Sequence, residues 1–111
     1  MAYDELLAHR VRELLADEVG LSEVPMFGGL AFTLDGNISV ALYSRGGLLV
    51  RVGQDALGAS LSRPHASVAR MGSRTMKGWA LIAPEGLATR RQLTTWVRKG
   101  VAYARSMPPK R

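Results

Sequence analysis

The sequence predicts a two-layer α+β fold in which three helices pack on one face of an antiparallel sheet. Apolar residues recur at helical spacing near both ends of the chain, whereas short alternating runs joined by tight turns fill its middle. The expected order is α-β-β-β-α-β-β-α, which gives a five-stranded sheet. With 111 residues, of which 47% are hydrophobic, the chain has the composition of one globular domain over residues 1–111. Residues 106–111 form a short basic tail that contains prolines.

The first helix is expected between Tyr3 and Val19, because apolar residues recur there every three or four positions. Acidic side chains occupy its first turn, which favours a helix N-terminus. Gly20 follows the last periodic residue, as is typical of a helix end. Pro25 and the glycine pair at 28–29 then interrupt the pattern before the first expected strand.

Alternating apolar residues mark the strands, and glycine-containing turns separate the first three of them. The strands are expected over residues 30–34, 38–42, 48–52, 67–71 and 79–83. A short helix is predicted over residues 54–62, since Pro64 prevents its continuation. Thr89 and Gln92 have the spacing of a capping box and open the last helix, in which apolar residues repeat on one face up to Ala104.

The residue types present offer no catalytic or metal constellation. Cysteine is absent, which removes disulfides, zinc thiolates and cysteine nucleophiles. The two histidines, His9 and His65, have no ligand spacing, and no serine lies in a nucleophile motif. We therefore expect no enzyme activity, no metal and no cofactor. The chain also lacks an apolar run long enough to span a membrane and begins with acids rather than a signal peptide, so we expect a cytoplasmic protein.

Charge is distributed unevenly along the chain, whose net charge is +6. Residues 1–50 hold three Arg against seven acids, and residues 51–111 hold twelve Lys or Arg against two acids. On the last helix Arg91, Arg98 and Arg105 are seven residues apart and share one stripe, which Arg90 and Lys99 flank. Since no acid lies between residues 89 and 105, this stripe is our candidate contact surface for an acidic partner or for nucleic acid.

Two short motifs and the chain end resemble a known family. They are Met26-Phe27-Gly28-Gly29, Met76-Lys77-Gly78-Trp79 and the ending from Ala104 to Lys110. In their order and spacing they resemble the N-terminal domain of the TfoX/Sxy family, over about residues 3–110. The resemblance implies a secretion-chaperone-like α+β fold with a five-stranded antiparallel sheet, and no catalytic residues. We interpret Met26, Phe27, Gly28, Gly29, Lys77, Gly78 and Trp79 as architectural.

The best-known members of that family are bacterial regulators of natural competence, which assist a cyclic-AMP receptor protein at promoters. They carry a second, C-terminal domain of helix-hairpin-helix character, and we expect this chain to be the first domain alone. Our leading hypothesis is a non-enzymatic regulatory or protein-interaction module with an unidentified protein partner. The first alternative is a nucleic-acid-binding protein that uses the basic helix and tail.

Two further hypotheses concern other partners. One is a small-molecule or enzyme role for a cleft near Gly28, Gly29, Arg51 and Lys77. The other is a homodimer in which the acidic first helix pairs with the basic last helix of a second copy. We expect no role at a membrane surface, because the small core needs the apolar face of the basic helix.

Overall fold

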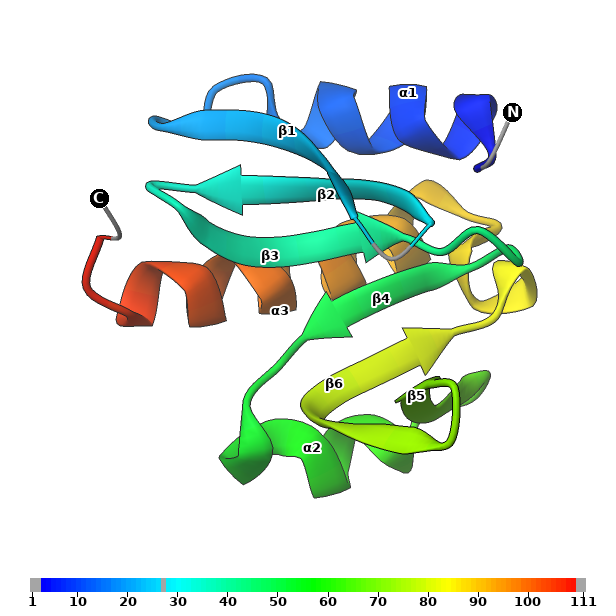
Figure 1. Cartoon of the computed structure of the whole chain (residues 1–111). Coiled ribbons are helices and arrows are strands. Elements are labelled where there is room, and N and C mark those ends of the chain that lie inside the picture. The colour runs from blue at the N-terminus through cyan, green and yellow to red at the C-terminus, as the bar shows by residue number, and fades with distance from the viewer. Residues whose placement is uncertain (1–2, 27, 110–111) are drawn as a thin grey trace.

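A computed structural model describes residues 3–26 and 28–109 and shows an antiparallel sheet with three α-helices (Figure 1). The elements in chain order are α1 (Glu5–Leu15), β1 (Leu21–Met26), β2 (Gly29–Leu34), β3 (Asn37–Leu42), β4 (Leu48–Arg51), α2 (Gln54–Leu61), β5 (Ala66–Met71), β6 (Arg74–Ile82), the 3-10 turn η1 (Pro84–Leu87) and α3 (Arg90–Ser106). The strands lie side by side in the order β1-β2-β3-β4-β6-β5. The predicted α+β class is confirmed.

The described sheet has six strands, so the prediction of five is wrong. The strand missing from the sequence prediction is β1, which pairs with β2 from Leu21 opposite Leu34 to Met26 opposite Gly29. It lies at the sheet edge and its residues are exposed or half-buried, so it lacks the alternation of a strand with one buried face. Pro25 fits there because an edge strand needs no donor on its outer side.

Two other boundaries differ from the sequence prediction by four residues or more. The first helix ends at Leu15, four residues before Val19, which is 77% exposed. The last strand begins at Arg74 rather than at residue 79. Its first residues pair with β5 in a hairpin whose register shifts between Val68 and Arg70, and this irregularity breaks the alternation on which the prediction depended.

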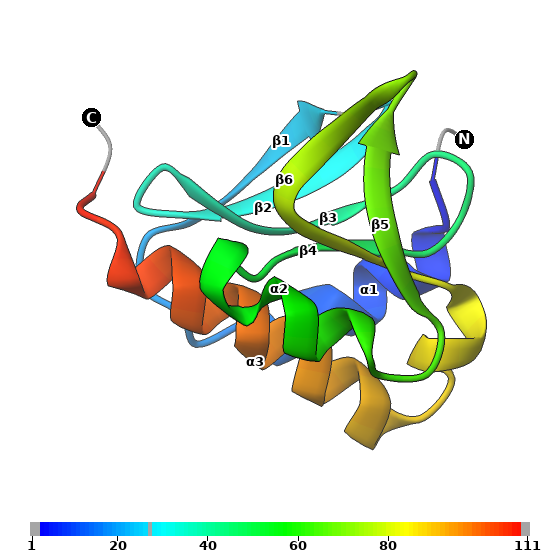
Figure 2. The same cartoon turned by 90° about the horizontal axis from the view of Figure 1, so that it is seen from below.

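The main core lies between the sheet and the three helices. Phe32, Val40 and Val50 face the helices and are fully buried. Leu15 of α1 and Trp96 of α3 pack into the same cluster, and Leu57 of α2 packs against its margin. Figure 2 shows all three helices beneath the sheet. Burial of these apolar side chains is the dominant force holding the two layers together.

On the opposite face of the sheet, side chains of its own strands pack against one another and exclude water. Ala41 and Leu49 are fully buried there, in a cluster that contains Trp79 of β6 and no helical residue. The β5–β6 hairpin rises on this side, away from the helices (Figure 2). Gly78 of β6 has φ +83°, a backbone conformation that glycine adopts without strain and that lets the strand bend. Its carbonyl accepts hydrogen bonds from the backbone N–H groups of Val52 and Gly53, both at 2.9 Å.

An ion pair ties the edge strand β1 to α1. Arg12 donates to the two carboxylate oxygens of Glu23 at 2.7 and 2.9 Å. These hydrogen bonds from the guanidinium hold the pKa of Glu23 below its ordinary value. Because this pKa is lowered in the folded state, the pair stabilises the fold at neutral pH, and its contribution is lost as the pH falls below about 4.3.

A glycine substitution tests the packing of β2 on β3. A Cβ atom on Gly29 would overlap the carbonyl oxygen of Leu42, which is backbone and cannot rotate away. We expect Gly29→Ala to lower the free energy of unfolding by at least about 2 kcal/mol in a urea titration. Gly58→Ala is the control: a Cβ there has open space in α2, so the variant should gain about 0.5–1 kcal/mol. Equal effects of the two substitutions would contradict this packing.

Candidate interaction surface

The helix α3 carries the predicted contact residues, and its N-terminus is capped by side-chain hydrogen bonds. Thr89 Oγ1 accepts a hydrogen bond from the Gln92 N–H at 3.1 Å, and Gln92 Oε1 accepts one from the Thr89 N–H at 2.9 Å. The predicted capping box is therefore present. From α1, Arg10 donates to the Leu87 carbonyl at 2.8 Å and so fixes the chain just before this helix.

The predicted stripe does not act as one surface, because Arg105 is engaged within the fold. Its guanidinium donates to Asp35 Oδ2 and Glu18 Oε1, each at 3.1 Å, and to the Val19 carbonyl at 2.6 Å. These bonds join the end of α3 to the α1–β1 loop and to the β2–β3 turn. Arg105 is thus a structural clamp, and its contact with a partner stays a prediction.

Lys99 lies on a different side of α3 from the other cations. Its ammonium is 5.9 Å from the ring centroid of Trp96, and the Arg63 guanidinium is 5.4 Å from the same ring. Lys99 also lines a hollow between α3 and α2, together with Val52 and with Ala56 of α2. The cation–π contact stabilises this junction, and it removes Lys99 from the group of cations that faces solvent together.

Three cations remain together on the first half of α3. Arg90, Arg91 and Arg98 are exposed and, with Thr94 and Thr95, line a shallow hollow of about 400 Å³. Among the described residues none of these three arginines forms an ion pair. We call Arg90, Arg91 and Arg98 the basic surface.

The basic surface lies at the electrostatically unfavourable end of its helix. Arg90 and Arg91 occupy the first turn of α3, which holds no acid. Aligned peptide dipoles make a helix N-terminus positive, so each cation in this turn costs roughly 0.3–1 kcal/mol. An anion bound at this end would relieve that repulsion.

An apolar groove adjoins the basic surface. It runs between α1 and α3, has a volume of about 300 Å³, and is lined mainly by apolar side chains such as Leu14, Val97 and Val101. Glu18 also lines it, and its carboxylate is paired with Arg105. Thr94 and Arg98 line both this groove and the hollow of the basic surface, so the two are continuous. Together they offer positive charge and apolar contact to one ligand. The sequence prediction missed the groove, since its two walls are about 80 residues apart in the chain.

The described motif residues lie in the sheet or in its β1–β2 connection, apart from the basic surface. Gly28 has φ +73° in the β1–β2 connection and Met26 ends β1. Lys77 is exposed on β6, next to the bend at Gly78, and Trp79 is buried in the cluster away from the helices. Phe27 lies outside the described residues, as do Lys110 and Arg111 of the predicted tail. The tail's Pro108 carbonyl accepts a hydrogen bond from Asn37 Nδ2 at 2.9 Å.

Metal and membrane features are absent from the described part of the chain. Residues 3–26 and 28–109 contain no group of three His, Asp or Glu side chains placed to hold a metal ion. None of the helices in these ranges is both long and apolar enough to cross a bilayer.

Comparison with known proteins identifies one family. The model of the TfoX N-terminal domain matches residues 13–104, which run from α1 through most of α3. This match confirms the resemblance seen in the two motifs. No curated protein and no solved structure matches the chain.

Substitutions on α3 separate the clamp from the basic surface. We expect Arg105→Ala to lower the free energy of unfolding by about 1–2 kcal/mol, because a side chain that is 34% exposed loses a carbonyl bond and two partly screened ion pairs. Arg98→Ala should change it by less than about 0.5 kcal/mol. Urea titrations of both variants measure the difference. A similar loss in the two variants would show that Arg105 is not a clamp.

Proposed function

Since the chain belongs to the TfoX N-terminal domain family, we propose that it is a non-enzymatic, regulator-like module that binds another protein. The observation that carries this proposal is the basic surface of α3, continuous with the apolar groove between α1 and α3. Membership of the family supports a regulatory role, and the surface supplies the chemistry of recognition.

The surface fits an amphipathic segment that carries acids. Carboxylates would meet Arg90, Arg91 and Arg98, and charge-assisted hydrogen bonds to arginine are the strong ones. Apolar side chains of the same segment would enter the groove beside Leu14 and Val101. A helix laid into a groove is a common mode of recognition. A bound carboxylate would also relieve the repulsion in the first turn of α3.

Nucleic acid is the second candidate, since α3 has no acid between residues 89 and 105. The same arginines would then contact phosphates. Aromatic side chains that stack on bases are missing from the basic surface, because Trp96 is 3% exposed and Tyr103 lies beneath the Arg51 guanidinium at 5.2 Å. This favours a protein partner over single-stranded nucleic acid.

Affinity capture from the native cell, with and without nuclease, tests the proposal. We expect a protein that the wild-type chain retains after nuclease treatment and that the Arg90→Ala, Arg91→Ala, Arg98→Ala triple variant loses. The matched control is the Arg70→Ala, Arg74→Ala, Lys77→Ala triple variant, which removes the same charge from the β5–β6 hairpin and should retain the protein.

Other outcomes decide against a protein partner. Loss of all captured material after nuclease would favour the nucleic-acid alternative, and steep weakening of purified binding with salt would support it. Equal capture by both triple variants would overturn the role of the basic surface.

The predicted homodimer is checked by sedimentation. Exposed acids on α1, such as Glu5 and Glu13, would supply the carboxylates that meet the basic surface of a second copy. The Arg90→Ala, Arg91→Ala, Arg98→Ala triple variant should then be monomeric.

The cost of the basic surface can be measured directly. We expect Arg91→Glu to raise the free energy of unfolding by about 0.5–1 kcal/mol, because an acid replaces a cation in the first turn of α3. The same variant should lose the captured protein. Arg98→Glu is the control, since it changes the net charge equally but lies beyond the first turn, and it should give no such gain. Thermal unfolding of both variants distinguishes a dipole effect from a general charge effect.

A further inference from the structure

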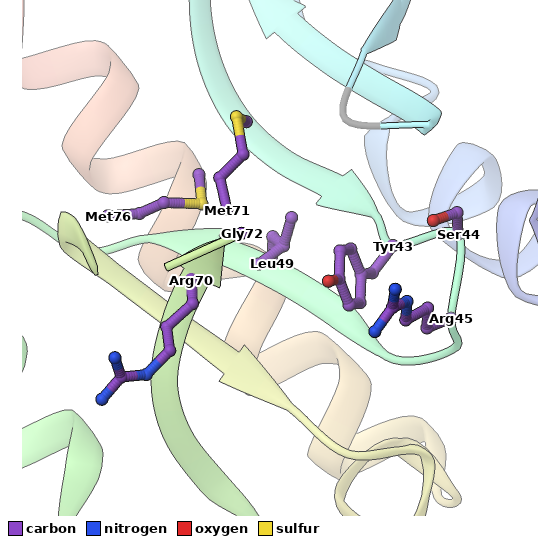
Figure 3. A pocket seen from close by; sticks show the side chains of 8 residues that line it. All are labelled: Tyr43, Ser44, Arg45, Leu49, Arg70, Met71, Gly72 and Met76. Atoms are coloured by element: carbon purple, nitrogen blue, oxygen red, sulfur yellow. The ribbon is translucent and has the colours of Figure 1, made fainter. Parts of the chain in front are cut away.

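A second concave site lies on the face of the sheet that the helices leave free. The cavity has a volume of about 330 Å³ and lies between the β3–β4 loop and the raised β5–β6 hairpin (Figure 3). Leu49 of β4 and Met76 of β6 line it, with Met71 at the end of β5. The cavity lies under the β5–β6 hairpin, which rises away from the helices in Figure 2.

The cavity combines apolar walls with one polar side. Leu49 is 1% exposed, and Met76 is half-buried. Methionine side chains adapt to the shape of an apolar ligand. Across from them the chain turns through Tyr43, Ser44 and Arg45, and Figure 3 shows the Tyr43 and Arg45 side chains at this side of the cavity. A ligand here would therefore meet apolar side chains at one end and hydrogen-bond donors at the other.

The charges around this cavity are all positive. It is lined by Arg45 and Arg70 and by no acid. Neither arginine forms an ion pair within the described ranges. Arg70 extends outward in Figure 3, whereas Arg45 lies at the polar side. The chain between Asp55 and Glu85 carries four Lys or Arg and no acid, so nothing on the hairpin neutralises these cations.

From these observations we propose that the cavity binds a small organic anion with a flat or branched apolar body. The Arg45 guanidinium presents a planar fork that matches a carboxylate or phosphate, and the Tyr43 hydroxyl is a further donor. Leu49, Met71 and Met76 contact the apolar body. This site is separate from the α3 surface and does not depend on the protein partner.

The site differs from the cleft that the sequence suggested. Of the residues expected there, Gly28 adjoins only the outer wall, where a Cβ atom on it would lie 3.1 Å from Ser44 Oγ. The Arg51 guanidinium lies over the Tyr103 ring instead, and Lys77 does not line the cavity. The β3–β4 loop supplies the cation in their place.

Titration with 2-naphthoate, followed by NMR of the methionine methyl groups, tests the proposal. We expect 2-naphthoate to shift the Met71 and Met76 methyl signals, and its neutral analogue 2-naphthamide to bind roughly tenfold or more weakly. Arg45→Gln should reduce the affinity for 2-naphthoate to that for the amide. Arg74→Gln removes an exposed cation of the same hairpin that does not line the cavity, and it should leave the affinity unchanged within twofold.

A second variant keeps the test decisive if Arg45→Gln does not fold. Met71 is 49% exposed, so Met71→Glu should preserve the fold while it places a carboxylate at the rim and abolishes 2-naphthoate binding. A 2-naphthyl phosphate titration establishes which anionic head group is preferred, and tighter binding of either head group supports the proposal. Equal affinity for acid and amide, unchanged binding by both variants, or absence of methyl shifts would overturn it.

Discussion

The fold depends on how the sheet buries its second face. Ala41 and Leu49 lie in its central strands, away from the helices, and are as inaccessible as residues of the main core. No described helix reaches them, so the sheet must bend over itself to exclude water. The register shift between β5 and β6 places four β6 residues, 76–79, opposite Ala69, and together with the positive φ of Gly78 it accounts for that bend. The same bend lifts the hairpin tip and leaves the cavity beneath it, so one conformational requirement both completes a core and forms a site.

Local signals predicted most of this fold. The α3 helix begins at a capping box and continues an apolar stripe, and both features lie within its own sequence. The hairpin of β2 and β3 was predicted from alternation and a glycine turn. In contrast, β1 is recognisable only by its pairing with β2, because an exposed edge strand with Pro25 has no periodicity of its own. The start of β6 at Arg74 was missed for a similar reason, since pairing with β5 decides it.

The candidate surface was predicted in part for related physical reasons. Spacing along a helix correctly placed Arg91 and Arg98 on one side of α3, since helical geometry is local. Helical spacing could not reveal that Arg105 forms ion pairs with Glu18 and Asp35, which lie 87 and 70 residues away in the chain. The cavity near Arg45 was likewise hidden, because its walls come from four separate segments. One signal was present in the sequence: the long stretch without acids between Asp55 and Glu85.

The unequal charge of the two halves of the chain acquires a physical meaning from these contacts. Three of the seven acids of the first half hold elements of the fold together: Glu23 holds α1 to β1, and Glu18 and Asp35 hold the end of α3. Among the described residues, the cations at the start of α3 form no ion pair, and the helix dipole makes their position unfavourable. Proteins tolerate such local conflicts mainly where a site requires them. We therefore propose that the arginines at the start of α3 and around the cavity serve recognition, on two separate faces of the molecule.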